Sequence, residues 1–404
     1  MKQTVLVLAV VFSLGLLFYG NLSFVKNNPG GNDFLPRWVG TRLFLTEGQN
    51  PYSRETTLAI QNAIYGRMAQ PGEDEALFVY PFYAMIFFAP FGLIRDYELA
   101  RAAWITFQEI CVVLTVIVAL RFGEWTLSPL ALGMLSLFGL TWYHGARPLV
   151  DGNAAILMTL LVSIGILFLS RSADFSAGIL FGLATIKPQM VLLLIGLAIV
   201  WTISLRRYGF VIGFLCTMAF LVGVSLLMSP TWIIENLEQI LAYQGYLPPM
   251  TPATIGELWL GNVGKWLGLA MNGFVAAILI NEWWRVRGKQ YVKFLWLACF
   301  TLAASSLAGV LSTSSNYAIL LPVLILVWAS WRKRMGARAN KLILAQGTLV
   351  LIGLWAVFTA TLSSGPQFRE SEVMFFLMPV FLVSNLYMLR PCANPTETRG
   401  LANG

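Results

Sequence analysis

The sequence is poor in charge and almost without histidine. Charged residues make up only 11% of the 404 residues, whereas a soluble domain carries roughly a quarter. Hydrophobic residues make up 57%, so the chain has too few polar side chains to cover a soluble fold. The single histidine, His144, excludes a metal site built from several histidines. These shortages indicate a membrane protein and exclude a histidine-rich metal centre.

Cysteine is also scarce. Cys111, Cys216, Cys299 and Cys392 stand in apolar runs or in the C-terminal tail, and their spacing matches neither a paired set nor a metal-ligand set. We interpret them as packing residues, which do not define the redox compartment.

Apolar runs near the length of about 20 residues that crosses a hydrocarbon layer recur along the chain. They predict an all-α polytopic membrane protein, with residues 1–404 forming a single integral membrane domain. The thirteen candidate segments are residues 4–20, 79–94, 102–120, 128–142, 154–170, 173–187, 189–205, 209–228, 262–281, 294–311, 316–331, 342–362 and 371–389.

The net charge of +8 comes from basic clusters between apolar runs, which is typical of cytoplasmic loops. We therefore expect no nucleic-acid partner. The clusters are Arg171, Arg206 with Arg207, residues 285–293, residues 332–341 and Arg390. Placing them in the cytoplasm puts residues 143–153, 188, 229–261, 312–315 and 363–370 outside.

The N-terminal run lacks a small-residue cleavage site, so we expect an uncleaved first helix that starts in the cytoplasm. If the candidate segments are counted forward from this helix, residues 143–153 come out on the cytoplasmic side, whereas the basic clusters place them outside. One candidate segment therefore does not span the membrane. The weakest candidate is the 15-residue run from Ser128 to Trp142, and we expect about twelve crossings in the cell membrane.

Two polar stretches are expected on the extracytoplasmic side. Residues 21–78 form the first outer loop, in which residues 56–68 have the spacing of a short amphipathic helix at the membrane surface. Residues 229–261 form a second outer segment, and the aromatic residues Trp232, Tyr243 and Trp259 suit an interfacial lid or a lipid entrance.

Asp33 is the leading candidate for a catalytic group. It follows two glycines that allow a sharp turn, and it lies beside Phe34 just after the first helix, where a carboxylate would be partly desolvated. That environment suits a general base. The alternative is that Asp33 is the N-cap of a helix starting at Phe34.

Lys187 interrupts a long apolar stretch, and Pro188 breaks the helix beside it. A lysine at the outer edge of a membrane runs against the positive-inside trend, so it suggests a bound anion such as a lipid phosphate. The alternative is a lysine that extends its ammonium group to the interface.

Other polar residues are less favoured as functional residues. Tyr80 precedes Pro81 at the start of an apolar run, which taken alone is structural. A divalent ion held by Asp33 and Asp151 is conceivable. Glu109 lies at membrane depth, where a structural role with Gln108 competes with a functional one.

The ordered motifs resemble glycosyltransferase family 87, the polyprenyl-phosphate-mannose-dependent transferases of the GT-C superfamily. The resemblance covers roughly residues 30–200. It rests on Asn32-Asp33-Phe34, Gly48 to Tyr52, Tyr80-Pro81-Phe82, Gly152-Asn153 and Gly182 to Gln189. The family's Tyr-Pro-Pro and Gly-Gln-Asn are altered here, and its Ser-Trp-x-His signature corresponds to residues 314–317, which contain no histidine.

The resemblance implies a GT-C-like bundle of about 12 transmembrane helices with a catalytic first outer loop. It implies transfer of a sugar, expected to be mannose, from a polyprenyl-phosphate donor to a lipid-linked or glycan acceptor, with Asp33 as general base. Among cofactors we predict only the lipid-linked sugar phosphate donor, and a divalent metal stays the less favoured alternative. With this reaction in view, we predict Lys187, Arg37 and Arg147 to bind the donor phosphate, and Tyr80, Asn153 and Gln189 to bind substrate. The alternatives are a glycan polymerase or ligase, and a lipid or glycan transporter or flippase.

Overall fold

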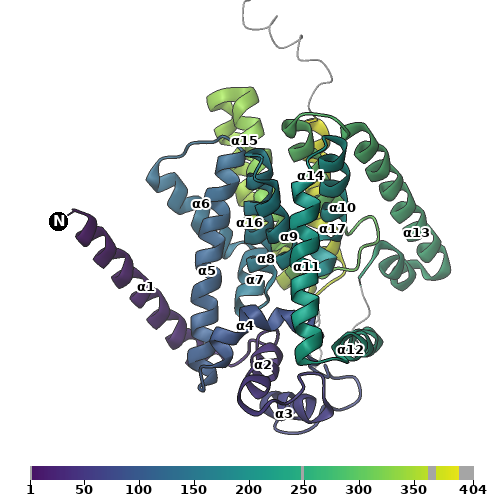
Figure 1. The fold of residues 1–404 in the computed structure, drawn as a ribbon. Coiled ribbons are helices and arrows are strands. Elements are labelled where there is room, and N and C mark those ends of the chain that lie inside the picture. Colours follow the sequence, from purple (N-terminus) through teal and green to yellow (C-terminus); the bar gives the residue numbers. More distant parts are fainter. Residues whose placement is uncertain (1, 247–249, 363–369, 391–404) are drawn as a thin grey trace, which may run out of the picture.

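The structure, a computed structural model, describes residues 2–246, 250–362 and 370–390, and these residues form a bundle of helices (Figure 1). Within those ranges the β-type pairing is limited to one isolated bridge between Met250 and Ser312. The all-α prediction is therefore confirmed. Cys392 and most of the predicted outer loop at 363–370 lie outside the described residues.

The bundle is built from helices that follow the apolar runs closely. The helices are α1 (Lys2–Asn27), α2 (Leu35–Glu47), α3 (Arg54–Tyr65), η1 (Phe82–Ala84), α4 (Met85–Gly92), α5 (Tyr97–Phe122), α6 (Pro129–Thr141), α7 (Tyr143–Asp151), α8 (Ala155–Ser170), α9 (Asp174–Leu183), η2 (Ala184–Ile186), α10 (Pro188–Ser204), α11 (Gly209–Met228), α12 (Trp232–Tyr246), α13 (Pro252–Val286), α14 (Tyr291–Ala304), η3 (Ser314–Leu320), α15 (Leu321–Met335), η4 (Gly336–Arg338), α16 (Ala339–Thr361) and α17 (Val373–Met388).

Five helical stretches of the described chain are long and apolar enough to cross a membrane: Val7–Asn27, Tyr97–Phe122, Gly209–Met228, Pro252–Val286 and Ser314–Thr361. Seven further apolar helices are shorter. The expected count of twelve crossings therefore stays a prediction. The longest helix, α13, bends at Gly261, whose φ of 60° and ψ of −146° are not helical.

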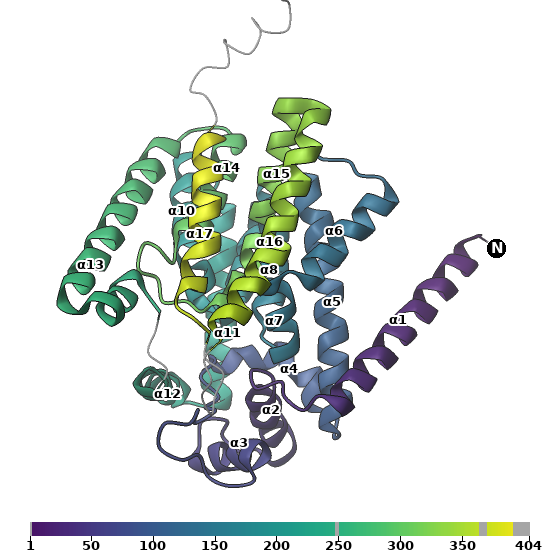
Figure 2. The same cartoon turned by 180° about the vertical axis from the view of Figure 1, so that it is seen from behind.

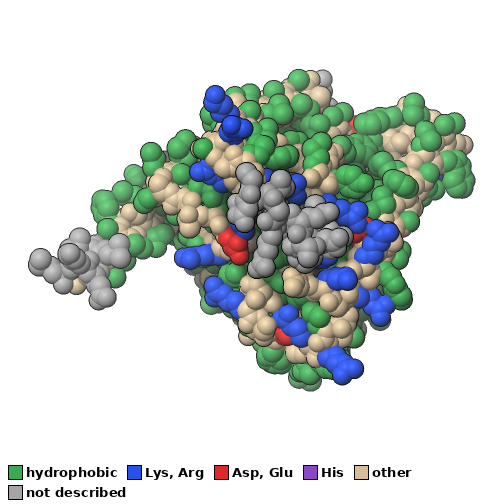
Figure 3. Space-filling view, turned by 90° about the horizontal axis from the view of Figure 1, so that it is seen from above, with side chains coloured by type: hydrophobic (Ala, Val, Ile, Leu, Met, Phe, Trp, Pro, Cys, Tyr) green, Lys and Arg blue, Asp and Glu red, His purple; other side chains and the backbone are tan. Residues whose placement is uncertain are grey.

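The predicted cytoplasmic clusters gather at one end of the bundle, which we call the basic end. There Arg207 pairs with Asp174, Lys333 pairs with Glu124, and Arg390 donates to Glu282 at 2.6 Å. Figure 3 looks onto this end, and Lys and Arg side chains outnumber Asp and Glu on its surface. The loops thus share one face, as the positive-inside interpretation requires.

The opposite end of the bundle, which we call the site end, carries α2, α3 and α12 (Figures 1 and 2). Helix α1 diverges from the bundle and contacts α5 near this end, where the Asn21 side chain donates to Thr106 Oγ1 at 3.0 Å and to Glu109 Oε2 at 2.6 Å. Glu109 is therefore hydrogen-bonded to the first helix and not to Gln108. The contact ties the C-terminal part of α1 to the middle of α5.

Helix α4 does not cross the bundle. Arg101, near the start of α5, donates to the carbonyl of Asn28 at 2.7 Å, and Trp38 Nε1 donates to the carbonyl of Phe91 at 3.0 Å. Both ends of the segment between α1 and α5 therefore lie at the site end. At 1.5 Å per residue, the eight residues of α4 are far too short to span a membrane.

This arrangement corrects the expected course of the chain. We expected the run from Ser128 to Trp142 to be the segment that fails to span, whereas α4, from the run at 79–94, is the one that turns back. If α4 is not counted as a crossing, counting the segments forward from a cytoplasmic Lys2 also places residues 143–153 outside. This placement agrees with the one obtained from the basic clusters. Arg101 then belongs to the site end, where it is buried.

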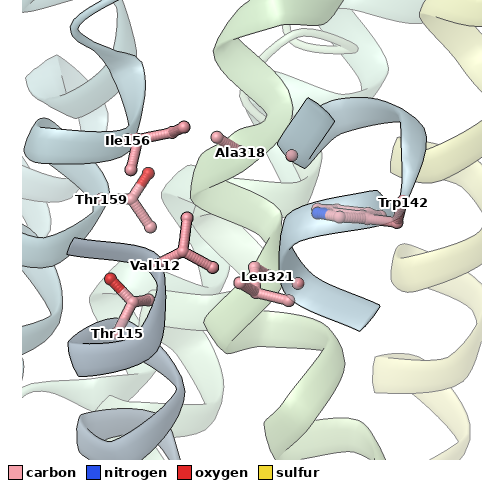
Figure 4. A pocket seen from close by; sticks show the side chains of 9 residues that line it. Val112, Thr115, Trp142, Ile156, Thr159, Ala318 and Leu321 are labelled. Carbon is pink, nitrogen blue, oxygen red and sulfur yellow. The ribbon is translucent and has the colours of Figure 1, made fainter. Parts of the chain in front are cut away.

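A small internal cavity of about 10 Å³ lies between α5, α6, α8 and α15 (Figure 4). The hydroxyls of Thr115 and Thr159 beside it donate to carbonyls of their own helices, at 2.8 and 2.7 Å. The remaining lining is mostly carbon, and room for about one water molecule is too little for a substrate. The cavity is a packing defect of the core.

Candidate functional site

The turn that carries Asp33 is fixed by the end of α7. The Asp33 and Phe34 amides donate to the carbonyl of Asp151, at 3.0 and 3.2 Å. Gly152 has a φ of 72°, and a Cβ on it would lie 2.5 Å from the Cβ of Phe34. The two chain segments therefore approach so closely that only glycine fits at position 152.

Asp33 does not cap a helix. Helix α2 begins at Leu35 after Phe34, and no side chain caps it. The Asp33 carboxylate, which is 34% exposed, instead accepts a hydrogen bond from Asn153 Nδ2 at 2.8 Å. The N-cap interpretation was therefore wrong, and the carboxylate is held by a residue that follows α7.

Asn153 connects Asp33 to Lys187. Its Oδ1 accepts from Lys187 Nζ at 2.5 Å, and Lys187 also donates to Asn316 Oδ1 at 2.8 Å. Lys187 is only 5% exposed and stands between η2 and α10, where Pro188 occupies the first helical position. The interpretation of Lys187 as a lysine extended to the interface was wrong, because its ammonium group lies inside a polar network.

Arg37 and Tyr80 complete this network. Arg37 lies one turn after Asp33 on α2, with its Nη1 3.9 Å from Asp33 Oδ1. Its guanidinium lies 4.4 Å from the centroid of the buried Tyr80 ring, a cation–π contact. The Arg37 Nε is buried without a hydrogen-bond partner among the described residues. Two cations therefore flank one carboxylate.

Arg147 belongs to a neighbouring group. Its Nε lies 2.9 Å from Asp151 Oδ2, and Glu370, which accepts from the Ser314 hydroxyl, is close enough to interact with it electrostatically. Burial raises the pKa of Glu370. Burial also raises the pKa of Asp151 to about 6, because desolvation outweighs the attraction of Arg147.

The structure brings most of the predicted site residues together but leaves Gln189 aside. Asp33, Arg37, Tyr80, Asn153 and Lys187 form the network, which we call the Asp33 network. Gln189 is half-buried at the start of α10, and within the described chain no hydrogen bond links its side chain to this network. Arg147 adjoins the Asp33 network through Asp151, whose carbonyl holds the Asp33 turn.

Three site residues were missed by sequence reasoning. Asn316 lies within residues 314–317, which correspond to the family's Ser-Trp-x-His signature, and this position could have marked it as a site residue. Its contact with Lys187 was not predictable from the sequence. Glu370 is far in sequence from the other site residues, and Tyr243 belongs to the second outer segment, so no local motif linked either of them to Asp33. The Tyr243 pKa is raised by burial and by Asp33, which puts the tyrosine near the carboxylate.

Metal ligation finds no support in the described residues, where no group of three or more His, Cys, Asp or Glu side chains is placed to hold an ion. Asp33 and Asp151 are engaged with Asn153 and Arg147 instead. His144 is fully buried, with Nδ1 2.9 Å from the Ser314 carbonyl. Burial lowers the pKa of His144 to about 3, so its ring is neutral and structural.

The fold and the site define a polytopic helical membrane protein with a buried polar network at one end of its bundle. The family model of glycosyltransferase family 87 matches residues 78–311, which is more than half of the chain. The protein therefore belongs to glycosyltransferase family 87 and is a membrane glycosyltransferase. The matched region contains Tyr80, Arg147, Asn153 and Lys187, while Asp33 and Arg37 precede it. Comparisons with curated proteins and with solved structures gave no match.

Proposed function

We propose that this glycosyltransferase moves a sugar, mannose in the first instance, from a polyprenyl-phosphate donor to a lipid-linked or glycan acceptor on the extracytoplasmic side. The observation that carries the proposal is the hydrogen-bonded chain from Asp33 through Asn153 to Lys187. It holds a partly exposed carboxylate and a buried cation side by side, which are the two groups that this reaction needs.

Asp33 is the general base. Its carboxylate takes the proton of the acceptor hydroxyl as the acceptor oxygen bonds to the anomeric carbon. The bond between that carbon and the phosphate oxygen breaks at the same time, and its electron pair leaves with the polyprenyl phosphate. Direct displacement by one base inverts the anomeric configuration, since a retaining mechanism uses a second carboxylate as nucleophile.

Lys187 and Arg37 stabilise the departing phosphate. Negative charge develops on the phosphate oxygens as the bond breaks, and fixed cations in a desolvated site lower the energy of that state. Lys187 is held by two asparagine oxygens, so its position is set before substrate arrives. Arg37 adds a guanidinium whose Nε has no hydrogen-bond partner among the described residues. Arg147 lies in the neighbouring group, where it pairs with Asp151.

The geometry of the bundle supports an extracytoplasmic site and a lipid donor. The Asp33 network lies at the end opposite the basic end, which the positive-inside rule assigns to the cytoplasm. A phosphate at the headgroup level would reach the network while the isoprenoid tail stays among the helices. No metal ion is assigned a role in this scheme.

The test is the substitution Asp33→Asn, which keeps the side-chain shape and removes the base. We expect sugar transfer from polyprenyl-phosphate mannose to a glycolipid acceptor to fall about 10²- to 10⁴-fold, the usual contribution of a general base. Transfer is measured with radiolabelled donor and purified protein in lipid nanodiscs. Thermal unfolding of the variant should stay near that of the wild type.

The matched control is Glu47→Gln, an exposed carboxylate at the far end of the same helix, α2. It should retain wild-type transfer. Full activity of Asp33→Asn would remove Asp33 as the base. Transfer from nucleotide sugars, with none from any polyprenyl-phosphate sugar, would exclude the lipid donor.

A further inference from the structure

A polar pocket of about 410 Å³ lies between α3 and α12 at the site end, and we call it the α3–α12 pocket. Its volume lies in the range of small-ligand sites. The pocket is separate from the Asp33 network and has no role in the steps described above. Its lining residues are Tyr52, Arg54, Thr57, Glu75, Leu77, Glu235, Glu238, Gln239 and Ala242.

The lining selects a class of ligand. Three glutamates and one arginine give it a formal charge of −2, so it repels a phosphate. Only Leu77 and Ala242 are aliphatic, so it does not suit a lipid tail. Carboxylate and guanidinium groups form strong, paired hydrogen bonds with polar ligands. A neutral ligand with many hydroxyl groups, that is, a sugar, matches this chemistry.

The charged groups of the pocket are free to bind such a ligand. Arg54, Glu75 and Glu238 are exposed, and in the described ranges none of them forms an ion pair. A sugar hydroxyl would therefore not have to displace an existing salt bridge.

The walls of the pocket are held in place by side chains that bridge its two sides. Gln239 of α12 accepts from the Val79 amide at 3.1 Å and donates to the Tyr52 carbonyl at 3.1 Å. Asn50 donates to both oxygens of Glu235 at 2.9 Å. These bonds connect α12 to the segments before α3 and before α4, so the pocket is pre-formed.

The pocket is linked to the Asp33 network through its lining residue Tyr52. The Tyr80 carbonyl accepts from the Tyr52 hydroxyl at 2.7 Å and from Asn236 of α12 at 3.0 Å. The ring of the same Tyr80 lies against Arg37. Tyr243, one turn after Gln239 on α12, is close enough to Asp33 to interact with it electrostatically. The pocket and the Asp33 network are therefore connected through Tyr80 and α12.

We propose that the α3–α12 pocket binds the neutral sugar units of the acceptor, with Arg54, Glu75 and Glu238 binding their hydroxyl groups. This inference rests on the proposed transfer to a glycan or glycolipid acceptor. The pocket holds the acceptor so that its reacting hydroxyl reaches Asp33, while the donor phosphate binds the cations on the other side of Tyr80.

The kinetic test is the double variant Glu75→Gln with Glu238→Gln. Each lost bond to a charged group typically weakens binding about tenfold or more, so we expect the acceptor KM to rise at least tenfold. The donor KM and kcat should stay within about twofold. The matched control, Glu55→Gln, changes an exposed carboxylate on α3 that does not line the pocket, and it should leave all three constants unchanged.

A binding test separates this inference from the proposed function. Saturation-transfer NMR on the full-length protein in nanodiscs, with methyl glycosides of mannose disaccharides as probes, measures sugar binding without turnover. We expect signals with the wild type, with Asp33→Asn and with Glu55→Gln, and loss of signal with the double variant. If no polyprenyl-phosphate sugar is a donor but this binding persists, the proposed function fails and the pocket assignment stands.

Three results would overturn the pocket assignment. They are unchanged acceptor KM and probe binding in the double variant, a rise in donor KM in place of acceptor KM, and equal losses in the double variant and the Glu55→Gln control. In each case the effect of Asp33→Asn on transfer still tests the proposed function independently.

Discussion

The Asp33 network and the α3–α12 pocket adjoin the same residue, Tyr80, yet they differ in burial and in charge. The network holds two cations, Lys187 and Arg37, beside one carboxylate, and Lys187 is 5% exposed. The pocket holds three carboxylates and one guanidinium, and its free charges are exposed. The contrast matches the two substrates of a transferase, since a phosphate needs fixed cations and a neutral sugar needs accessible hydrogen-bonding groups.

The difference also predicts how each region responds to mutation. A buried ammonium group such as that of Lys187 has few alternatives to its present partners, so its loss costs catalysis and stability together. An exposed glutamate is solvated in the absence of ligand, so its loss changes binding alone. Variants of the two regions should therefore separate effects on rate from effects on acceptor binding.

Lys187→Met should cause the largest loss in the network. The change keeps side-chain length but removes the cation, and it leaves Asn153 Oδ1 and Asn316 Oδ1 without this donor. We expect transfer to fall about 10²- to 10³-fold, the usual cost of losing one group that stabilises developing negative charge. Initial rates with varied donor and acceptor check this, and acceptor KM should stay within about twofold.

The matched control for Lys187 is Lys265→Met, an exposed lysine on α13 that pairs with Glu257 at 3.3 Å. It should retain full activity. An equal rise of donor KM and acceptor KM in Lys187→Met would contradict the assignment of separate roles to the Asp33 network and the α3–α12 pocket. It would mean that one region binds both substrates.

Gly152→Ala should have a smaller effect, confined to the network. The new Cβ would lie 2.5 Å from Phe34 Cβ at a backbone φ of 72°, so the Asp33 turn must shift. A displacement of about 1 Å at a catalytic group costs up to about 10²-fold in rate. We expect a 10- to 100-fold loss of kcat with acceptor binding unchanged, measured by the same assays.

Gly66→Ala separates backbone strain from the clash. Gly66 has a similar φ of 67° but nothing within 4 Å of the position of a Cβ, so this variant should lose stability without losing transfer. Similar losses of kcat in both glycine variants would show that the Asp33 turn is not held by its contact with Gly152.

Helices that are uniformly apolar were predictable from the sequence, and short or amphipathic ones were less so. The run at 209–228 is α11 residue for residue, because burial in lipid requires an unbroken apolar stretch. Residues 56–68 were predicted as a helix, and α3 spans Arg54–Tyr65. Helix α2, which mixes charged and apolar residues, was considered only in the alternative that Asp33 caps a helix starting at Phe34, and it begins at Leu35. The run at 79–94 was apolar enough to be a membrane segment, but the helix within it ends after eight residues.

The site was predictable where the motifs of the family resemblance lie, roughly at residues 30–200. Asp33 and Lys187 were chosen from residue type and position, Tyr80 and Asn153 were chosen from the family motifs, and the four residues lie in one network. Asn316, Glu370 and Tyr243 come from elements whose packing depends on contacts between distant helices, which no local pattern contains. The catalytic and binding roles of all these residues stay predictions.

Asp151 is expected to affect stability without a change in rate, and it shows what burial does on the network side. Its carboxyl has a pKa of about 6 in the folded protein against an ordinary value of 3.8, because burial outweighs the attraction of Arg147. The folded state therefore holds the proton more tightly than the unfolded state. Stability should decrease as pH rises from 4 to 6.5, by about 2–3 kcal/mol at 1.4 kcal/mol per pKa unit. Thermal unfolding of wild type and Asp151→Asn across this range checks it: the Asp151→Asn variant should gain on the wild type as pH rises, and a constant difference would show that Asp151 ionises without cost and resembles the exposed carboxylates of the pocket.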